Sequence, residues 1–457
     1  MSDKLEEYLE GFLPKAMLRR SEVAFSSQLN LIRNLFKQRR IPQSGWPDHV
    51  IGLLMRLLSM MDTDKDIDGI RIGEREARVA SPLVSELAWG FCHGVGRSGS
   101  LLSPQPKAPG ASVLYGLANK CALDAMQKLG AFNLKSAIVS PVATGMSIAL
   151  ALAATRDSIR GERDTVVFAR VDHDSPLKAM NLVNLKARVI EGKTYDDAVR
   201  VPVTDIAEAI DKRCSAILST TTFFPPRETD SIADIARIAS EQNIPHIINN
   251  AYGAQSRETM REIRLAIDAG RVDAVVQSTD KNFLTPVGGA IIASPDEDFA
   301  EKVASSYVGR ASASPIYQFL ASILSVGIDG YERLRDAQES NRKLLETLLG
   351  EAAESCGERM LKVKSPIACA MTVSNADPSL LGGILYSLRV SGPRVIPRGS
   401  RGSCCDNYPY SYVVVNAAIG STETDIFNAV EKLKEGMKQT IAKRTGKREP
   451  DHTRPQR

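Results

Sequence analysis

Past the middle of the chain the sequence reads Val272-Asp273-Ala274-Val275-Val276-Gln277-Ser278-Thr279-Asp280-Lys281-Asn282, and the glycine pair Gly288-Gly289 follows. The apolar start of this stretch predicts a short buried strand, with Lys281 directly after it. Hydroxyl groups before the lysine can bind a phosphate, and the glycines leave room for a flat ring. A Schiff base with pyridoxal phosphate requires a lysine amine placed in this way. We therefore predict that Lys281 binds this cofactor and that Ser278 contributes a hydroxyl group.

A second polar strand end lies upstream, in His246-Ile247-Ile248-Asn249-Asn250-Ala251-Tyr252-Gly253. In enzymes of the aspartate-aminotransferase-like fold, the group that contacts the pyridine nitrogen stands at such a strand end, one helix and one strand before the lysine. Asn249 takes that place, where the usual residue is aspartate. Asparagine can only hydrogen-bond to the ring, so we expect a weaker electron sink. Taken alone, a lysine after a strand is more often a solvated strand end than a cofactor anchor.

Two further segments favour the cofactor site. Asp172-His173-Asp174-Ser175-Pro176-Leu177-Lys178-Ala179 follows an apolar strand and is similar to the segment in which an imidazole stacks on the cofactor ring. His173 could also be an exposed residue at a helix N-terminus. In Pro141-Val142-Ala143-Thr144-Gly145-Met146-Ser147, a strand turns into an apolar helix whose free N–H groups can bind an anion. We predict that Ala143, Thr144 and Gly145 bind the cofactor phosphate.

Seven short apolar runs between Ser136 and Ser294 predict the strands of one sheet. Their continuous apolar character indicates burial on both faces, hence a mostly parallel sheet between helix layers, an α/β fold of the aminotransferase-like type (fold type I). They lie at residues 138–142, 166–169, 187–190, 216–219, 244–248, 274–277 and 290–293. We expect a helical N-terminal extension (1–65), a cofactor-binding large domain (66–330), a small α+β domain (331–443) and a disordered basic tail (444–457).

Composition narrows the class of protein. With 457 residues, 43% of them hydrophobic and 25% charged, the chain is typical of a globular protein with more than one domain. No apolar run is long enough for a membrane span and no secretory signal is visible, so we expect a cytoplasmic protein without membrane contacts. The seven cysteines are scattered along the chain, so we expect no disulfides. No two of the five histidines stand at helical spacing, so we expect no metal site.

Two loops rich in glycine and arginine precede the sheet, at residues 73–80 and 93–100, and the second continues to Gln105-Pro106-Lys107. The second loop contains G-x-G-x-x-G, but it follows a predicted helix end and lacks the acidic residue that a dinucleotide site needs. Such loops can enclose a phosphate. Because the cofactor phosphate has its own site near Thr144, we assign this second anion site to the substrate.

The motifs G-E-R-E-x-R, H-G-x-G-R-S-G, Q-P-K-A, A-T-G-M-S, N-N-A-Y-G, Q-S-x-D-K-N-F, P-V-G-G-A-I-I and G-R-A-S-A-S-P together resemble the O-phosphoseryl-tRNA:selenocysteinyl-tRNA synthase family over about residues 15–430. The resemblance implies that Lys281 holds pyridoxal phosphate. It assigns five residues to the substrate phosphate, partly across a subunit boundary in a homotetramer: Arg75, Arg97, Ser98, Gln105 and Arg310. It also implies that the N-terminal helix and one C-terminal arginine bind tRNA(Sec), for which the candidates are Arg33, Lys37, Arg39, Arg40 and Arg394.

The activity that this resemblance implies is conversion of O-phosphoseryl-tRNA(Sec) to selenocysteinyl-tRNA(Sec). Phosphate would leave by β-elimination, and selenophosphate would add selenium to the dehydroalanyl-tRNA. One alternative is a pyridoxal-phosphate lyase acting on free cysteine or selenocysteine, which leaves the arginine loops and the basic extension without a role. Another is a tRNA-binding protein without activity, which the intact Lys281 and Arg97 disfavour. Basic clusters at both chain ends permit a polyanionic partner, although solvated surface is the usual explanation.

Overall fold

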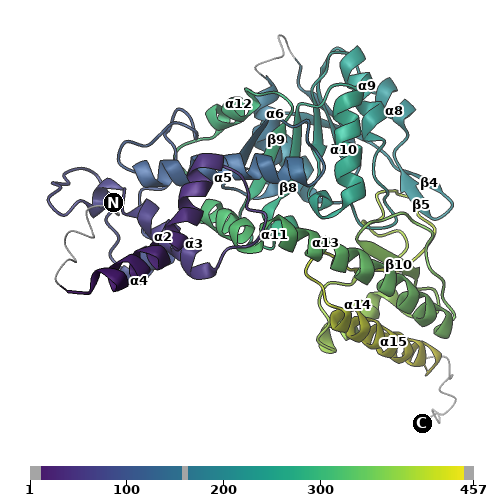
Figure 1. Ribbon diagram of the computed structural model, residues 1–457. Coiled ribbons are helices and arrows are strands. Elements are labelled where there is room, and N and C mark those ends of the chain that lie inside the picture. The colour runs from purple at the N-terminus through teal and green to yellow at the C-terminus, as the bar shows by residue number, and fades with distance from the viewer. Residues whose placement is uncertain (1–11, 157–162, 447–457) are drawn as a thin grey trace, which may run out of the picture.

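The structure is a computed structural model that describes residues 12–156 and 163–446 (Figure 1). Its centre is a seven-stranded sheet in the order β1-β9-β8-β7-β6-β2-β3. The run from β8 to β3 is parallel, whereas β9 is antiparallel to both of its neighbours. The predicted α/β fold with a mostly parallel sheet is confirmed. The strands are β1 (Ser136–Ser140), β2 (Thr165–Ala169), β3 (Lys186–Ile190), β6 (Cys214–Thr220), β7 (His246–Asn249), β8 (Ala274–Ser278) and β9 (Ala290–Ser294).

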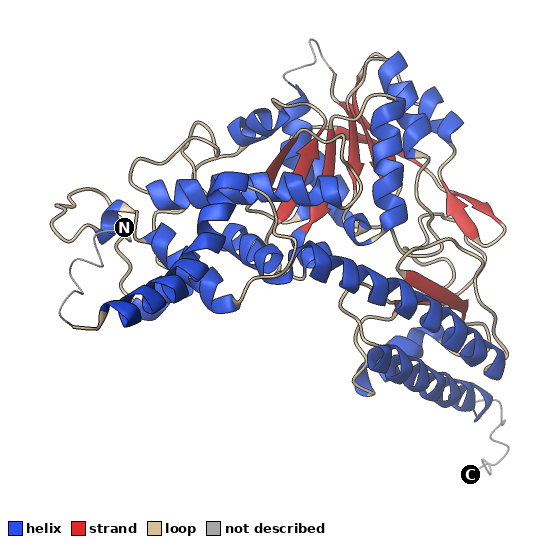
Figure 2. Cartoon of the chain, in the orientation of Figure 1, coloured by secondary structure: helices blue, strands red, loops and turns tan. Residues whose placement is uncertain are grey.

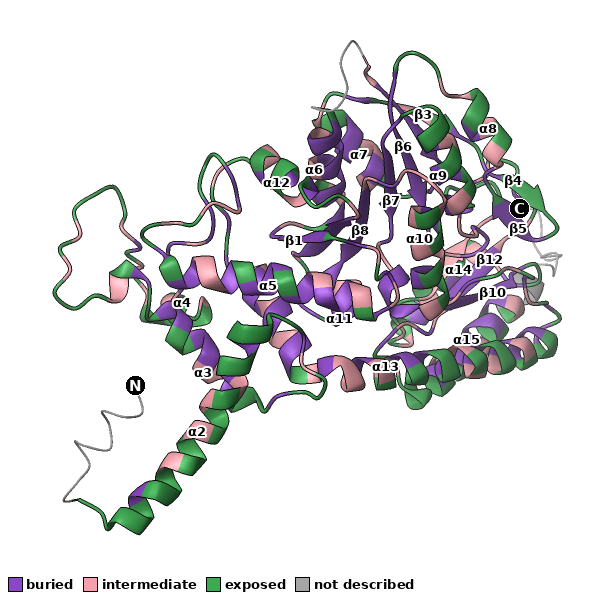
Figure 3. Ribbon diagram, turned by 45° about the horizontal axis from the view of Figure 1, so that its top comes forward, coloured by how far each residue is buried: buried purple, intermediate pink, exposed green. Residues whose placement is uncertain are grey.

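Burial explains the continuous apolar strands. Every strand of this sheet except the edge strand β3 is buried along its whole length, and each buried Val or Ile side chain contributes about 1.5–3 kcal/mol. Helices enclose the buried strands (Figure 3). These helices are α5 (Pro109–Lys128), α6 (Thr144–Arg156), α7 (Asp174–Leu182), α8 (Val203–Glu208), α9 (Ile232–Glu241), α10 (Arg257–Ala269), α11 (Thr279–Phe283) and α12 (Phe299–Ser306), with the short 3-10 turn η2 (Gly253–Gln255).

Two details differ from the sequence prediction. Strand β1 ends at Ser140 rather than at residue 142, because Pro141 has no N–H to continue the ladder. A small hairpin of β4 (Lys193–Tyr195) and β5 (Ala198–Arg200) was not predicted. Strand β4 is fully exposed and polar, so it lacks the apolar pattern that identifies a strand.

The N-terminal helices α2 (Lys15–Gln38) and α3 (Asp48–Ser59) are joined by a non-helical break at residues 42–46, and this break packs into a kink of the long helix α13 (Ser314–Ser355). At the kink Gly327 adopts φ 64°, and a side chain there would overlap the backbone at Gly45. Ile328 N–H donates to the Pro42 carbonyl at 3.0 Å. The break at residues 42–46 and the kink at Gly327 therefore form one junction.

Helix α13 continues from the large sheet to a second sheet (Figure 2). The second sheet has three strands, in the order β10-β12-β11. That sheet and the helices around it have their own apolar core. The elements are β10 (Ala368–Thr372), α14 (Pro378–Ser387), β11 (Arg394–Ile396), β12 (Tyr412–Asn416) and α15 (Glu423–Gly446). Residues 447–457 of the predicted basic tail lie outside the described residues.

Candidate active site

Lys281 lies on the short helix α11, directly after β8. Its Nζ is 5.4 Å from the ring centre of Tyr252 and 3.8 Å from the Asp280 carboxylate. Asn282 fixes the helix, because its amide donates to the carbonyls of Ser278 at 2.7 Å and Ala251 at 2.9 Å. One third of the lysine side chain is exposed, so a ligand can reach the amine.

The other predicted cofactor residues lie at the same edge of the sheet as Lys281. Strand β9 is antiparallel to both β1 and β8, so β1 runs in the same direction as β7 and β8, and their carboxyl ends share one edge. Thr144 begins α6 after β1, His173 follows β2, and Asn249 ends β7. In open α/β sheets ligands bind at this edge.

Two of these residues have buried side-chain atoms without a hydrogen-bond partner among the described residues: Oγ1 of Thr144 and Oδ1 of Asn249. Such atoms cost about 1–3 kcal/mol each when they stay unpaired. Thr144 lies at the N-terminus of a helix, where an anion can bind, and Asn249 lies at the strand end where a ring atom would be expected. Both positions therefore suit the phosphate and the ring of pyridoxal phosphate.

The remaining cofactor candidates have more local contacts. His173 caps α7 by accepting a hydrogen bond from Ser175 N–H at 3.2 Å. Burial lowers the pKa of His173, and the cations Lys281 and Arg394 lower it further. The Ser278 hydroxyl donates to Asp280. Ala143 is exposed and Gly145 is half-buried at the start of α6.

An aromatic cluster that the sequence did not single out connects Lys281 to Arg394. The Tyr252 ring lies 5.4 Å from the Phe224 ring, and the Arg394 guanidinium stacks over Phe224 at 4.7 Å. Tyr252 belongs to the N-N-A-Y-G motif that begins at Asn249, and this position in the sequence could have identified it as a residue of the site. No comparable signal marks Phe224 in the sequence.

Of the five predicted substrate-phosphate residues, two line a common cavity of about 530 Å³, Arg75 and Arg310. Its wall is built from two paired loops, because Val95 N–H donates to the Ala311 carbonyl at 2.9 Å and Ala311 N–H returns a bond at 3.1 Å. Arg97 and Ser98 are exposed on the loop beside this wall. Gln105 donates to the Gly96 carbonyl at 3.4 Å.

This arginine cavity does not include the lysine site. Its lining contains none of Lys281, Asn249 and His173. Within one chain, the described residues therefore form two separate places that could bind an anion: the N-terminus of α6 and the arginine cavity.

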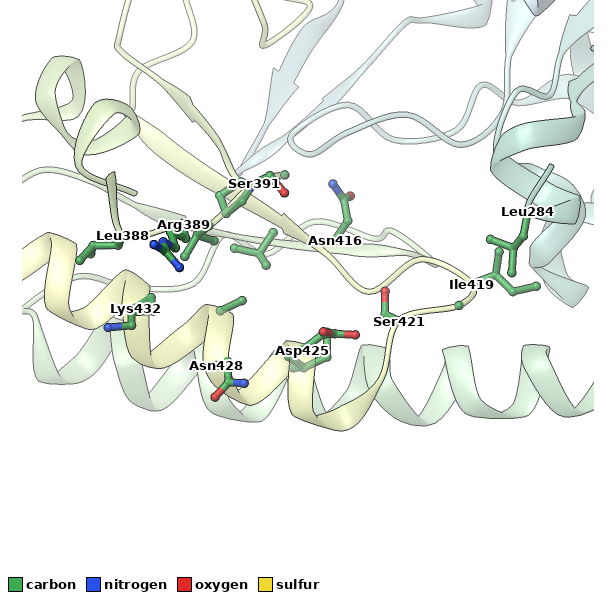
Figure 4. Close-up of a pocket in the computed structure, with 17 residues that line it drawn as sticks. Leu284, Leu388, Arg389, Ser391, Asn416, Ile419, Ser421, Asp425, Asn428 and Lys432 are labelled. Atoms are coloured by element: carbon green, nitrogen blue, oxygen red, sulfur yellow. The ribbon is translucent and has the colours of Figure 1, made fainter. Parts of the chain in front are cut away.

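The predicted tRNA-binding residues lie in two places. Arg33, Lys37, Arg39 and Arg40 are exposed on or just after α2, a helix with a largely exposed surface (Figure 3). Arg394 lies on β11, and the preceding residue, Pro393, lines a groove of about 760 Å³ between the small sheet and α15 (Figure 4). Arg389 and Lys432 supply positive charge to this groove.

Among residues 12–156 and 163–446, no cluster of three or more His, Cys, Asp or Glu side chains could hold a metal ion. No described helix has the length and apolar character that a membrane span requires.

Gly94→Ala tests the paired loops of the arginine cavity. Gly94 has φ 70°, and a Cβ atom would overlap the Ala311 carbonyl oxygen. We expect the change to destabilise the protein by about 2 kcal/mol and to weaken binding of inorganic phosphate, measured by thermal unfolding and calorimetry. Gly99→Ala on the same loop is the control, since nothing lies within 4 Å of its Cβ position. Equal effects of the two changes would contradict the role of the Val95–Ala311 pairing.

Comparison with known proteins gives one consistent result. The family model described as O-phosphoseryl-tRNA(Sec) selenium transferase, SepSecS, matches residues 61–438. The O-phosphoseryl-tRNA(Sec) selenium transferase of Methanocaldococcus jannaschii is 44% identical over 435 residues, which cover 93% of this chain and 99% of that protein.

Solved structures agree. The crystal structure of an archaeal O-phosphoseryl-tRNA(Sec) selenium transferase superposes with a TM-score of 0.89 at 44% identity, covering 93% of this chain and 98% of that one. A sphingosine-1-phosphate lyase of Burkholderia pseudomallei has a TM-score of 0.56 at 14% identity, covers 95% of this chain and 93% of that chain, and shows a likeness of fold alone. The chain therefore belongs to the O-phosphoseryl-tRNA(Sec) selenium transferase (SepSecS) family.

Proposed function

We propose that this enzyme converts O-phosphoseryl-tRNA(Sec) to selenocysteinyl-tRNA(Sec), with selenophosphate as the selenium donor. The observation that carries the proposal is the position of Lys281 at the ligand-binding edge of the sheet, the same edge at which Asn249 and Thr144 have unpaired buried atoms. Family membership supports the choice of substrate, because the relatives bear that name. Charged tRNA is consumed in protein synthesis, so we expect the enzyme to act in the cytoplasm.

Pyridoxal phosphate is the proposed cofactor, and when bound it withdraws electrons from the substrate Cα. Lys281 would hold the cofactor through its amine until the substrate amine displaces it, and the freed lysine amine would then accept the Cα proton. Thr144 and the free N–H groups of α6 bind the phosphate of the cofactor, with Ala143 and Gly145 forming the backbone around it. Asn249 hydrogen-bonds to the ring nitrogen without adding charge, and His173 covers the ring. Ser278 remains a weaker candidate, because its hydroxyl is already bonded to Asp280.

The substrate phosphate binds in the arginine cavity. Arg75 and Arg310 line it, and we add Arg97, Ser98 and Gln105 from the adjoining loop. Guanidinium groups bind phosphate with paired, charge-assisted hydrogen bonds, and these strengthen as negative charge grows on the departing group. Selenophosphate carries the same type of anion, so the cavity can bind the selenium donor after phosphate has left.

Because Lys281 does not line this cavity, we propose that the arginine cavity of one copy meets Lys281 of a second copy, in a homo-oligomer that is a tetramer. The segment that carries Arg75 supports an interface, since it exposes large apolar side chains to solvent in the single chain. These side chains are Ile67, Ile70, Ile72, Leu83 and Leu87.

The positions of the basic residues indicate where tRNA would bind. We propose that α2, through Arg33, Lys37, Arg39 and Arg40, binds the phosphate backbone of the acceptor arm. Arg394 follows Pro393, which lines the groove of Figure 4, and its guanidinium stacks over Phe224 in the aromatic cluster near Lys281. It therefore suits contact with nucleotides near the 3′ end. On this proposal residues 1–65 form the tRNA-binding extension, 66–330 the cofactor domain and 331–443 the small domain.

Thr144→Val tests the cofactor phosphate site, because it should affect protein stability and cofactor affinity in opposite directions. Removing an unpaired buried hydroxyl should leave the stability of the cofactor-free protein unchanged or raise it. The same change should weaken binding of pyridoxal phosphate about 10-fold, as measured by titration of the apoprotein. Thr155→Val is the control, because that hydroxyl is buried but donates to the Leu152 carbonyl at 2.8 Å. It should lower stability without changing cofactor affinity, and a reversed pattern would rule out the assigned role of Thr144.

The function itself is tested by supplying purified protein with pyridoxal phosphate, selenophosphate and O-phosphoseryl-tRNA(Sec), and measuring selenocysteinyl-tRNA. Free O-phosphoserine and free selenocysteine are supplied in parallel. Product from the tRNA substrate alone supports the proposal. Turnover of a free amino acid in preference to the tRNA would support the alternative lyase.

A further inference from the structure

The arginine cavity contains a histidine, His93, that has no role in the reaction as proposed above. Only 3% of the His93 side chain is exposed, yet this residue lines the cavity together with Arg75 and Arg310. Its Nε2 atom has no hydrogen-bond partner among the described residues. A buried ring nitrogen that lacks a partner costs free energy unless a ligand or a transferred proton uses the ring.

A carboxylate faces this ring. Asp64 Oδ1 lies 3.9 Å from His93 Nε2 and is also without a hydrogen-bond partner in the described part of the chain. The other oxygen of Asp64 is paired with Lys65, which also donates to the Gly90 carbonyl at 2.8 Å. The carboxylate is thereby fixed on the short turn η1 (Thr63–Lys65). Because Asp64 faces Nε2, Nδ1 is the ring nitrogen from which a proton transfer into the cavity would have to come.

Charges of both signs surround the ring. Burial lowers the pKa of His93; Asp64 and Glu76 act against this, whereas Arg310 and Lys107 add to it. Asp64 belongs to the turn η1, Glu76 to the loop at 73–80, Lys107 to the loop at 105–107, and Arg310 to the segment after α12. These segments surround the ring. The balance favours a neutral ring in the empty cavity, and an entering phosphate dianion would favour the protonated ring.

We propose that His93 gives a proton to the departing phosphate, and that Asp64 is the residue that positions the imidazole. This rests on the proposed function. When the Cβ–O bond of the substrate breaks, its electron pair stays on the phosphate oxygen, and without a proton the group would leave as a trianion. Transfer of the imidazolium proton to that oxygen lets it leave as the hydrogen phosphate dianion. His93 becomes neutral, and it takes up a proton from solvent when the next dianion binds.

The first test counts protons and needs no tRNA. Binding of inorganic phosphate to the full-length holoenzyme is measured by calorimetry in buffers of different ionisation enthalpy. We expect the wild type to take up more protons on binding than His93→Asn, and this comparison removes the titration of phosphate itself. His49→Asn is the control, because His49 is exposed on α3 and should bind protons as the wild type does. Equal proton uptake by His93→Asn and the wild type would overturn the proposal.

The second test compares leaving groups. With O-phosphoseryl-tRNA, His93→Asn should lower kcat by about 10²–10⁴-fold while changing KM little. With tRNA carrying O-sulfoserine, whose leaving group needs no proton, the loss should be less than about 10-fold. Equal losses with the two substrates would make His93 a structural residue and overturn its role as proton donor.

Asp64→Asn provides a second variant in case His93→Asn folds poorly. It should keep the cavity but lower the pKa of the imidazole, so the pH limit of kcat should move to lower pH. An unchanged pH profile would overturn the positioning role of Asp64. Failure of the wild type to make selenocysteinyl-tRNA would instead contradict the proposed function, whatever the proton count.

Discussion

Lys281→Ala is expected to abolish turnover, lowering it by about 10⁴-fold or more, because one amine serves as both the cofactor anchor and the base. The variant should also lose the visible absorption of lysine-bound pyridoxal phosphate. It should still fold, since the helix that carries Lys281 is fixed by the hydrogen bonds of Asn282. The measurements are an absorption spectrum, a thermal melt and single-turnover formation of product.

Lys343→Ala is the matched control for this prediction, because Lys343 is an exposed lysine on α13. It should retain both spectrum and turnover. Retained turnover in Lys281→Ala would remove the lysine from its catalytic role. Loss of turnover with an unchanged spectrum would mean that another amine holds the cofactor.

The large sheet was predictable because its strands are short, apolar and buried on both faces. Each predicted run, from the first at residues 138–142 to the last at residues 290–293, coincides with a strand to within two residues at either end. The ligand edge was also predictable, since polar residues such as Asn249 and Lys281 stand where apolar strands stop. A change from apolar to polar residues is visible directly in the sequence.

Contacts between distant segments were not predictable. The packing of the break at residues 42–46 into the kink at Gly327 depends on backbone hydrogen bonds, which leave no pattern of side chains in the sequence. The Arg394 guanidinium of the small sheet stacks over Phe224, which follows a strand of the large sheet. Asp64 lies near His93, but it stands in a polar turn that has no apolar periodicity to mark it. In these cases the three-dimensional path of the chain, rather than the local pattern, brings the groups together.

The arginine loops show a second kind of limit. Their composition predicts an anion site, but not which side chains share the cavity, because Arg75 and Arg310 meet only through the pairing of Val95 with Ala311. The relation of this cavity to Lys281 depends on a second copy of the chain in the proposed function. A single sequence cannot report such an arrangement.

Arg310→Gln is expected to have the second largest effect. The guanidinium lines the cavity on the segment paired with the loop of His93, and glutamine keeps a hydrogen-bond donor while removing the charge. Losing one charged donor to a developing anion costs about 10²–10³-fold in kcat. We expect this loss with O-phosphoseryl-tRNA, together with weaker inhibition by inorganic phosphate, whereas the cofactor spectrum should be unchanged because Lys281 does not line the cavity.

Two comparisons make this prediction specific to the cavity. Arg75→Gln, at another residue that lines the same cavity, should lower phosphate affinity in the same way, because each guanidinium contributes its own charge-assisted bonds. Arg333→Gln, an exposed arginine on α13, should behave as the wild type does. If Arg310→Gln lowered turnover without changing inhibition by phosphate, the guanidinium would act elsewhere than on the phosphate. A fall in cofactor affinity of the same size would mean that the Arg310 guanidinium also binds the cofactor.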